Sequence, residues 1–232
     1  MTVPYWRFDQ PAPRVFSRSF MGRTDTAAGA VGFTPANPLG LFATDGQIGV
    51  SRRPIFDTQL EAASSLVGPV LPEQSVVPDQ GTYNALRRPR ELNPHGRAHT
   101  SFDIGFITQI PEAVRDPLFF LLHANVDRLW AKWQWFNSRF DLANQATYFF
   151  QAAAGTPGAE RIGHNALDTM WPWNDDRVDP RPGTAPRTPF PGSPLVAVPG
   201  PAPTVGTMID YQGVVNPVNQ LGFDYDDVPF ES

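Results

Sequence analysis

Two of the four histidines in this chain lie four residues apart, in the segment His95-Gly96-Arg97-Ala98-His99. On a helix with 3.6 residues per turn, this spacing puts both imidazoles on one face, where they could bind one metal ion. His123 follows within a long apolar segment. Imidazole suits copper or zinc, and three histidine ligands leave a coordination position open for a reactive ligand. We therefore predict that His95, His99 and His123 bind one metal ion. The alternatives are a coincidental spacing for the pair His95 and His99, and a hydrogen-bonded core histidine for His123.

Other kinds of site are disfavoured by the residue types. Cysteine is absent from the 232 residues, which excludes disulfides, thiolate metal sites and cysteine nucleophiles. Gly96 stands where a zinc peptidase of the HExxH type has its catalytic glutamate, so that hydrolase lacks its general base. The fourth histidine, His164, lies beside a glycine and is expected in an exposed loop rather than in a site.

Helices must position the three imidazoles. Asp116 is expected to cap a helix that Pro117 opens and that continues to Phe136 without Gly or Pro; its apolar first half indicates burial. A shorter helix is expected to start at Asn93-Pro94, with Asn93 as its N-cap. Further helices are expected over 55–66 and over 81–92, the latter interrupted at Pro89.

The remaining segments predict irregular chain. Residues 1–54 are punctuated by Pro and Gly and should hold a few short strands, and 208–230 should be short strand and loop. Residues 180–204 are rich in proline and are expected to form an extended surface loop. We expect a single domain over 1–232 of mainly α class, a partial helical bundle with irregular loops.

Charge and hydropathy exclude several classes of partner. Eighteen basic and twenty-three acidic residues give a net charge of −5, which disfavours a nucleic acid or an anionic membrane as partner. No run of about twenty apolar residues could span a membrane. The N-terminal residues lack the features of a signal peptide, so a cytoplasmic location is expected, with export in the company of a partner as the alternative.

The segment from Asp116 to Trp130, DPLFFLLHANVDRLW, resembles the second copper-site signature of the tyrosinase and polyphenol oxidase family. Upstream, ELNPHGRAH at 91–99 is similar to the E-x-x-P-H-x-x-x-H segment of that family. The PYW stretch at 4–6, the DTMWPW stretch at 168–173 and the LGFDYD stretch at 221–226 resemble further family segments. The resemblance therefore extends along nearly the whole chain.

This resemblance implies a tyrosinase-like helical bundle in which two coppers, each held by three histidines, bind O2 and oxidise o-diphenols to o-quinones. Tyrosinases also hydroxylate monophenols. By position, His95, His99 and His123 match the three ligands of the second copper. Glu91 matches an acidic residue that positions a water near the site, and its carboxylate could accept a phenol proton through that water. An ordinary solvated carboxylate is the alternative for Glu91.

The chain departs from the family pattern in three places. No histidine precedes His95, so the ligands of the first copper are missing. Leu122 replaces a histidine that usually precedes the third ligand but does not bind the metal. Gly96 stands where many monophenol hydroxylases have Asn, which favours diphenol oxidation over hydroxylation. Asp127 and Arg128 are expected to form a structural salt link, or alternatively to orient an imidazole.

The missing ligands leave three possibilities for function. A companion polypeptide or segment could supply the first copper site to an oxidase that acts on a phenolic substrate and O2. Two copies of the chain related by a twofold axis could instead supply six imidazoles. In the third case the chain is a non-catalytic module, derived from such an oxidase, in which one metal ion serves stability or interaction alone.

Overall fold

The computed structural model describes residues 2–44, 46–76, 91–109, 111–141, 143 and 205–227. The chain divides into two compact units, each described by itself below. The first unit comprises Met1–Val3, Asp79–Ala85 and Trp133–Ser232, and the second comprises Pro4–Pro78 and Leu86–Lys132. All three histidines of the predicted cluster belong to the second unit. That unit is therefore the one that positions the site.

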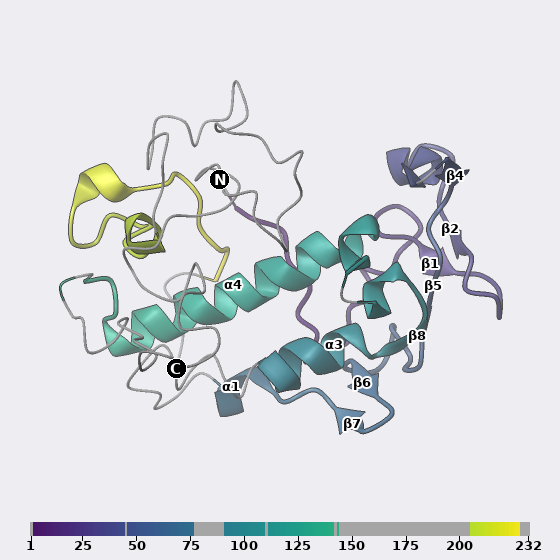
Figure 1. Ribbon diagram of the computed structural model, residues 1–232, viewed down its shortest axis with the longest axis horizontal. Coiled ribbons are helices and arrows are strands. Elements are labelled where there is room, and N and C mark those ends of the chain that lie inside the picture. Colours follow the sequence, from purple (N-terminus) through teal and green to yellow (C-terminus); the bar gives the residue numbers. More distant parts are fainter. Residues whose placement is uncertain are drawn as a thin grey trace, which may run out of the picture. The chain divides into compact units, whose positions relative to one another are not determined.

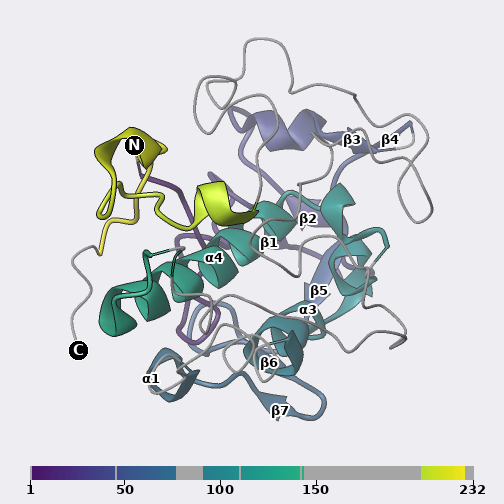
Figure 2. The same cartoon turned by 60° about the vertical axis from the view of Figure 1, so that its left-hand side comes forward.

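The longest described helix is α4, Leu118–Asn137, which crosses both views of the ribbon (Figures 1 and 2). Its start is as predicted, because Asp116 Oδ1 accepts a hydrogen bond from Leu118 N (2.9 Å) and Pro117 stands at the first turn. One face of α4 is apolar and buried, and it includes Leu118 and Leu122. The expected burial on nearly all sides is wrong for the opposite face, where the Phe120 side chain is 59% exposed.

The remaining described helices are short. They are α1 (Glu73–Val76), the helical segment Glu91–Gly96, α3 (Arg97–His99), and 3₁₀ turns at Pro38–Leu41, Phe106–Thr108, Ala113–Arg115, Val205–Met208 and Pro217–Asn219. The chain kinks at Asn93, whose backbone is extended (φ −151°, ψ 117°), and continues helically to α3. The helix expected from Asn93-Pro94 therefore forms, but the Asn93 side chain accepts from Leu71 N (2.7 Å) instead of capping that helix.

Four small antiparallel pairs make up the described sheets. They are β1 (Arg23–Thr24) with β2 (Val31–Gly32), β3 (Ala43–Thr44) with β4 (Gln47–Ile48), β5 (Arg52–Pro54) with β8 (Phe102–Gly105), and β6 (Ser64–Ser65) with β7 (Gly68–Pro69). The short strands expected within 1–54 are thus confirmed. The mainly α expectation holds only in part, because helix content is modest beside the strands and loops of the described residues.

The helix expected over 55–66 is wrong. Ile55 N donates to Ser101 O (3.0 Å), which continues the pairing beside β5, and residues 64–65 form β6. Asp57 begins a turn in which its Oδ1 accepts from Gln59 N (2.9 Å), and such a local side-chain bond competes with helix formation. The apolar residues of this segment are divided between core and surface, because Phe56 and Ala63 are buried while Leu60 and Leu66 are exposed.

An aromatic cluster forms the core of the second unit. Trp6 packs edge-to-face on Phe16, with ring centroids 5.2 Å apart, and its ring lies parallel to that of Phe56. Phe8 and Phe102 complete this cluster, and all five rings are buried. Trp6 N also donates to Leu121 O (3.0 Å), which attaches the N-terminal segment to α4 two residues before the predicted ligand His123.

A buried ion pair fixes the start of α4. Arg52 Nε in β5 donates to Asp116 Oδ2 (3.0 Å), and both side chains are 1% exposed. Asp116 therefore both caps the helix and joins it to the β5–β8 pair. Because a buried pair is costly to break, this contact holds the first turn of α4 in one place.

Beyond the end of α4, the described part of the first unit is turn, loop and short 3₁₀ helix. The loop expected within 208–230 is present, whereas the described residues 208–227 contain one isolated bridge, at Asp224, in place of the expected short strand. Gln134 Nε2 donates to Ile209 O (2.8 Å), and Val3 N donates to Asp224 O (3.1 Å). Among the described residues, no helix is long and apolar enough to cross a membrane. The predictions for residues 81–90, His164, 168–173 and the proline-rich 180–204 lie outside the described residues. The single domain over 1–232 stays a prediction.

Gly105→Ala should destabilise the protein by at least about 2 kcal/mol. Gly105 has φ +113°, and a Cβ there would overlap the carbonyl oxygen of Ser51 in the neighbouring strand. Gly46→Ala is the matched control, because Gly46 also has positive φ (+78°) but open space around its Cβ position. Urea unfolding of both variants measures the difference. Equal losses would show that the close approach at Gly105 costs nothing.

Candidate metal centre

The three predicted imidazoles meet between α3 and α4. His99 lies in α3, His95 in the helical segment just before it, and His123 in the second turn of α4. His123 Nε2 is 3.3 Å from His99 Nε2 and 3.4 Å from His95 Nε2. One ring nitrogen from each residue lies within 4.8 Å of the other two. The structure therefore brings all three rings to one point, as the sequence predicts.

These separations fit a single ion. Metal–imidazole bonds of about 2.0–2.1 Å in tetrahedral geometry place ligand nitrogens about 3.3–3.4 Å apart. The two Nε2–Nε2 distances from His123, 3.4 Å to His95 and 3.3 Å to His99, match that spacing. An imidazole donor set suits copper and zinc. The three side chains thus offer the donor set of such a site and two of its three nitrogen–nitrogen spacings.

The outer nitrogens of two rings have partners that set their orientation. His99 Nδ1 donates to the carbonyl oxygen of Ile107 (2.7 Å). Because a carbonyl can only accept, Nδ1 carries the proton and the Nε2 lone pair is left facing the cluster. His95 Nδ1 lies 3.6 Å from Glu91 Oε1. The Glu91 side chain is 66% exposed. It lies beside His95 Nδ1, whereas His95 Nε2 faces His123. The catalytic role predicted for Glu91 stays a prediction.

An aromatic wall covers one side of the cluster. The Phe119 ring lies over the His123 ring, with centroids 4.1 Å apart and planes 30° apart, and it is 6.2 Å from His99. Leu122, at the position where the family usually has a histidine, is fully buried on the core side of α4. The cluster therefore has an apolar boundary formed by the helix that carries His123.

Burial keeps the rings in the form that binds metal. Burial, together with the nearby rings of His95 and His99, lowers the pKa of His123 to about 4. Burial also lowers the pKa of His99, although its hydrogen bond to Ile107 acts in the opposite direction. Neutral imidazole is the form that coordinates a metal ion. At neutral pH these two rings are accordingly ready to bind.

A buried carboxylate that sequence reasoning missed stabilises the helix beyond the cluster. Glu73, in α1, accepts from Arg128 (2.8 Å) and Lys132 (2.6 Å), and Arg7 lies 3.1 Å from it. Arg128 is fully buried, so the expected salt link exists for this residue, with Glu73 as its partner. No local pattern marks Glu73, since its partners are 55 and 59 residues away along the chain.

Comparison with known proteins gives the family. A model of the common central domain of tyrosinase matches residues 1–136, more than half of the chain. The chain belongs to the tyrosinase family. Tyrosinases of Streptomyces lincolnensis and Streptomyces glaucescens are 34% and 35% identical to it over 95 residues, 41% of this chain. Oxidase hkm6 of Aspergillus hancockii is 34% identical over 79 residues, 34% of this chain.

The matched segment spans 30% of the length of each of those two tyrosinases and 27% of the fungal oxidase. The family expectation is thus confirmed for this tyrosinase-family chain, and its one described three-histidine cluster is consistent with a single copper site. The family implies copper, and the donor set of His95, His99 and His123 fits that metal.

Glu73→Gln should remove the part of the acid-induced loss of folding stability between about pH 4.5 and pH 2 that Glu73 contributes. Although burial alone would raise it, the hydrogen bonds from Arg128 and Lys132 lower the pKa of Glu73 from 4.5 to about 2. The unfolded chain therefore takes up this proton first, so the contribution is complete above pH 4.5 and disappears as the pH falls to 2. The shift corresponds to about 3 kcal/mol.

Urea unfolding of the metal-free protein at several pH values measures this contribution. The stability difference between the parent protein and the Glu73→Gln variant should shrink by about 3 kcal/mol on going from pH 5 to pH 2. The control is Glu112→Gln, which removes a surface pair with Arg115 (3.3 Å) and should change stability by less than about 1 kcal/mol. A pH-independent difference for Glu73→Gln would contradict this assignment.

Proposed function

We propose that this chain supplies one copper centre of a tyrosinase-type oxidase and that the centre corresponds to the second copper site of the family. The observation that carries the proposal is the convergence of three Nε2 atoms, at 3.3 Å and 3.4 Å from the His123 atom to the other two. The family match and the segment 116–130 support copper over zinc. His95, His99 and His123 would hold the ion.

The proposed reaction is the oxidation of an o-diphenol to an o-quinone. Each o-diphenol gives up two electrons and two protons as it becomes an o-quinone. Two o-diphenols therefore reduce one O2 to two water molecules. Copper, when bound, supplies the centre at which electrons pass to O2. In this proposal Glu91, whose Oε1 lies 3.6 Å from His95 Nδ1, takes a phenol proton through an intervening water. Gly96 next to His95 favours diphenols over monophenols as substrates.

A second set of three copper ligands cannot come from the same copy of residues 1–232. These residues hold four histidines and no cysteine, so they cannot provide six imidazoles. A companion segment or a second copy of the chain would supply them, and the exposed Phe120, one turn before His123, lies on the helix face that such a partner could cover. The alternative function, a metal-binding module without catalysis, is consistent with the single described cluster.

Copper titration of the full chain, followed by native mass spectrometry and a catechol assay, tests this proposal. We expect one copper per chain, lost in His95→Ala and retained in His164→Ala, which removes the one histidine outside the cluster. We expect the copper-loaded protein to form quinone. If a second copy completes the centre, the rate of quinone formation should rise more steeply than in proportion to the chain concentration.

Two results would decide against the oxidase. Copper bound equally well by His95→Ala would refute the three-histidine site itself. Tight copper binding by the parent chain without quinone formation, both at high chain concentration and with a tyrosinase-family polypeptide carrying its own three histidines, would assign the chain as a metal-binding module.

A further inference from the structure

One short segment contacts both of the helices that carry the metal ligands. Residues 69–73, here called the clamp segment, run from the end of β7 to the start of α1. Its middle is held by a hydrogen bond from Val70 N to Ala63 O (3.0 Å), and the Val70 side chain is buried. No residue of this segment belongs to the histidine cluster.

The first end of the clamp segment holds the helical segment that carries His95 and His99. Leu71 N donates to Asn93 Oδ1 (2.7 Å), two residues before His95. Arg97 Nη1, between the two histidines, donates to Pro69 O (2.8 Å), and Asn93 Nδ2 makes a longer contact to the same oxygen (3.4 Å). The backbone of the clamp segment therefore fixes the kink from which both ligands project.

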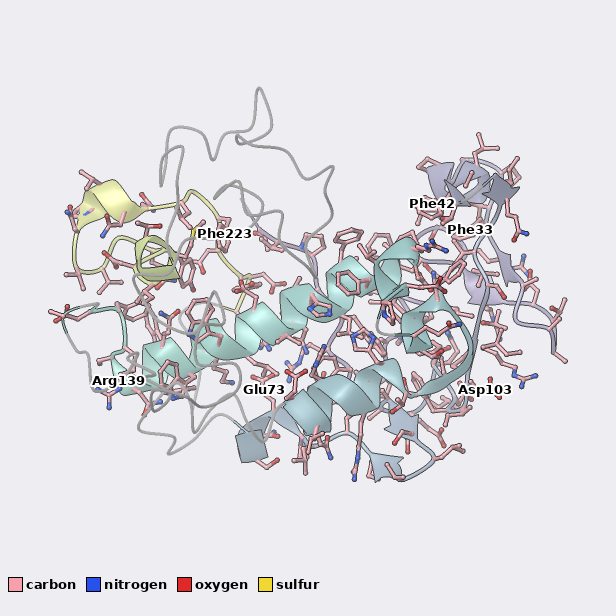
Figure 3. The ribbon with its side chains drawn as sticks, viewed as in Figure 1. Phe33, Phe42, Glu73, Asp103, Arg139 and Phe223 are labelled. Atoms are coloured by element: carbon pink, nitrogen blue, oxygen red, sulfur yellow. The ribbon has the colours of Figure 1, made fainter. Side chains whose placement is uncertain are left out.

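The second end holds α4, which carries His123. Glu73 accepts from Arg128 Nη1 (2.8 Å) and Nη2 (3.3 Å) and from Lys132 Nζ (2.6 Å), and its side chain is 4% exposed. Its backbone N–H donates to Asp9 Oδ2 (2.9 Å), which keeps the carboxylate in place. Figure 3 labels Glu73 between α1 and α4. Two positions of α4 beyond His123 are thus tied to one carboxylate.

We propose that the clamp segment sets the separation of the two ligand-bearing helices, and that Glu73 and Asn93 are positioning residues for the metal centre. This inference rests on the proposed function only in taking the three histidines as metal ligands. The two bonded positions, Leu71 at one end and Glu73 at the other, are only two residues apart in the chain. A shift of either helix must therefore strain or break one end of the clamp.

The expected effect is on metal affinity and on the geometry of the site. Metal ligands tolerate little displacement. Loss of a group that bonds a ligand directly reduces affinity about 10- to 100-fold, and Glu73 and Asn93, which act through the backbone that carries the ligands, are expected to have an effect at the lower end of that range. Glu73→Gln keeps the shape of the side chain but removes its charge, so Arg128 and Lys132 lose their shared anion. Asn93→Ala removes the acceptor for Leu71 N at a partly exposed position, where the fold itself should persist.

The experiment compares the full-length parent chain with Glu73→Gln, Asn93→Ala and the double variant. Cobalt(II) is the probe, because its visible absorption reports both affinity and ligand geometry. Each single variant should bind cobalt about 10-fold or more weakly, with an altered absorption band. Because either change opens the same clamp, the double variant should lose no more than about threefold beyond the weaker single variant. Ser75→Ala, which removes a hydrogen bond to Pro72 O (2.7 Å), is the matched control.

Three outcomes would overturn the inference. The first is unchanged cobalt affinity and absorption in both single variants. The second is a loss of cobalt affinity in the double variant equal to the product of the losses in the two single variants. Independent changes add as free energies and therefore multiply as affinities. The third comes from metal-free crystals of Asn93→Ala and Glu73→Gln: Nε2–Nε2 separations still at 3.3 Å and 3.4 Å would show that the clamp does not set them.

The same set of measurements separates this inference from the proposed function. Failure of the parent chain to oxidise catechol would contradict the oxidase while leaving the cobalt results intact. A parent chain that binds no metal would remove the ligand role of the histidines, yet the metal-free crystals would still show whether the clamp controls the spacing of the rings.

Discussion

The whole account depends on three imidazole nitrogens from two helices being held within bonding distance of one point. An imidazole ring binds a metal ion there only in its neutral form. Burial favours the neutral form of His99 and His123 by lowering their pKa values. The bond from His99 Nδ1 to Ile107 O then directs the lone pair inward. A core histidine could share the burial and the hydrogen bond, but the convergence of three ring nitrogens within 4.8 Å of one another is the feature of a metal site.

Buried ions hold the helix that brings His123 to this point. Arg52 binds Asp116, which precedes His123 in the chain, and Glu73 binds Arg128, which follows His123. Buried ion pairs add little net stability compared with apolar packing, but they are expensive to break and so favour one arrangement. A site that needs ring nitrogens at fixed separations benefits from that restriction, whereas the aromatic cluster around Trp6 contributes apolar burial.

Local signals in the sequence predict what depends on neighbouring residues. The Asp116-Pro117 start of α4, the i, i+4 pair His95 and His99, and the short strands before residue 55 were all predictable. Long-range contacts were not: Glu73 meets Arg128 across 55 residues, and Ile55 pairs with Ser101 in place of forming a helix. The Asn93 side chain bonds Leu71 instead of capping its own helix, which local capping rules cannot anticipate.

X-ray absorption of the copper-loaded chain tests the central claim most directly, because it counts the imidazole ligands of the bound ion. The account predicts three imidazole nitrogens at about 2.0 Å in the parent protein and two in His123→Gln. One or two imidazoles in the parent protein, or the same count in both proteins, would contradict the convergence of His95, His99 and His123 on one metal ion.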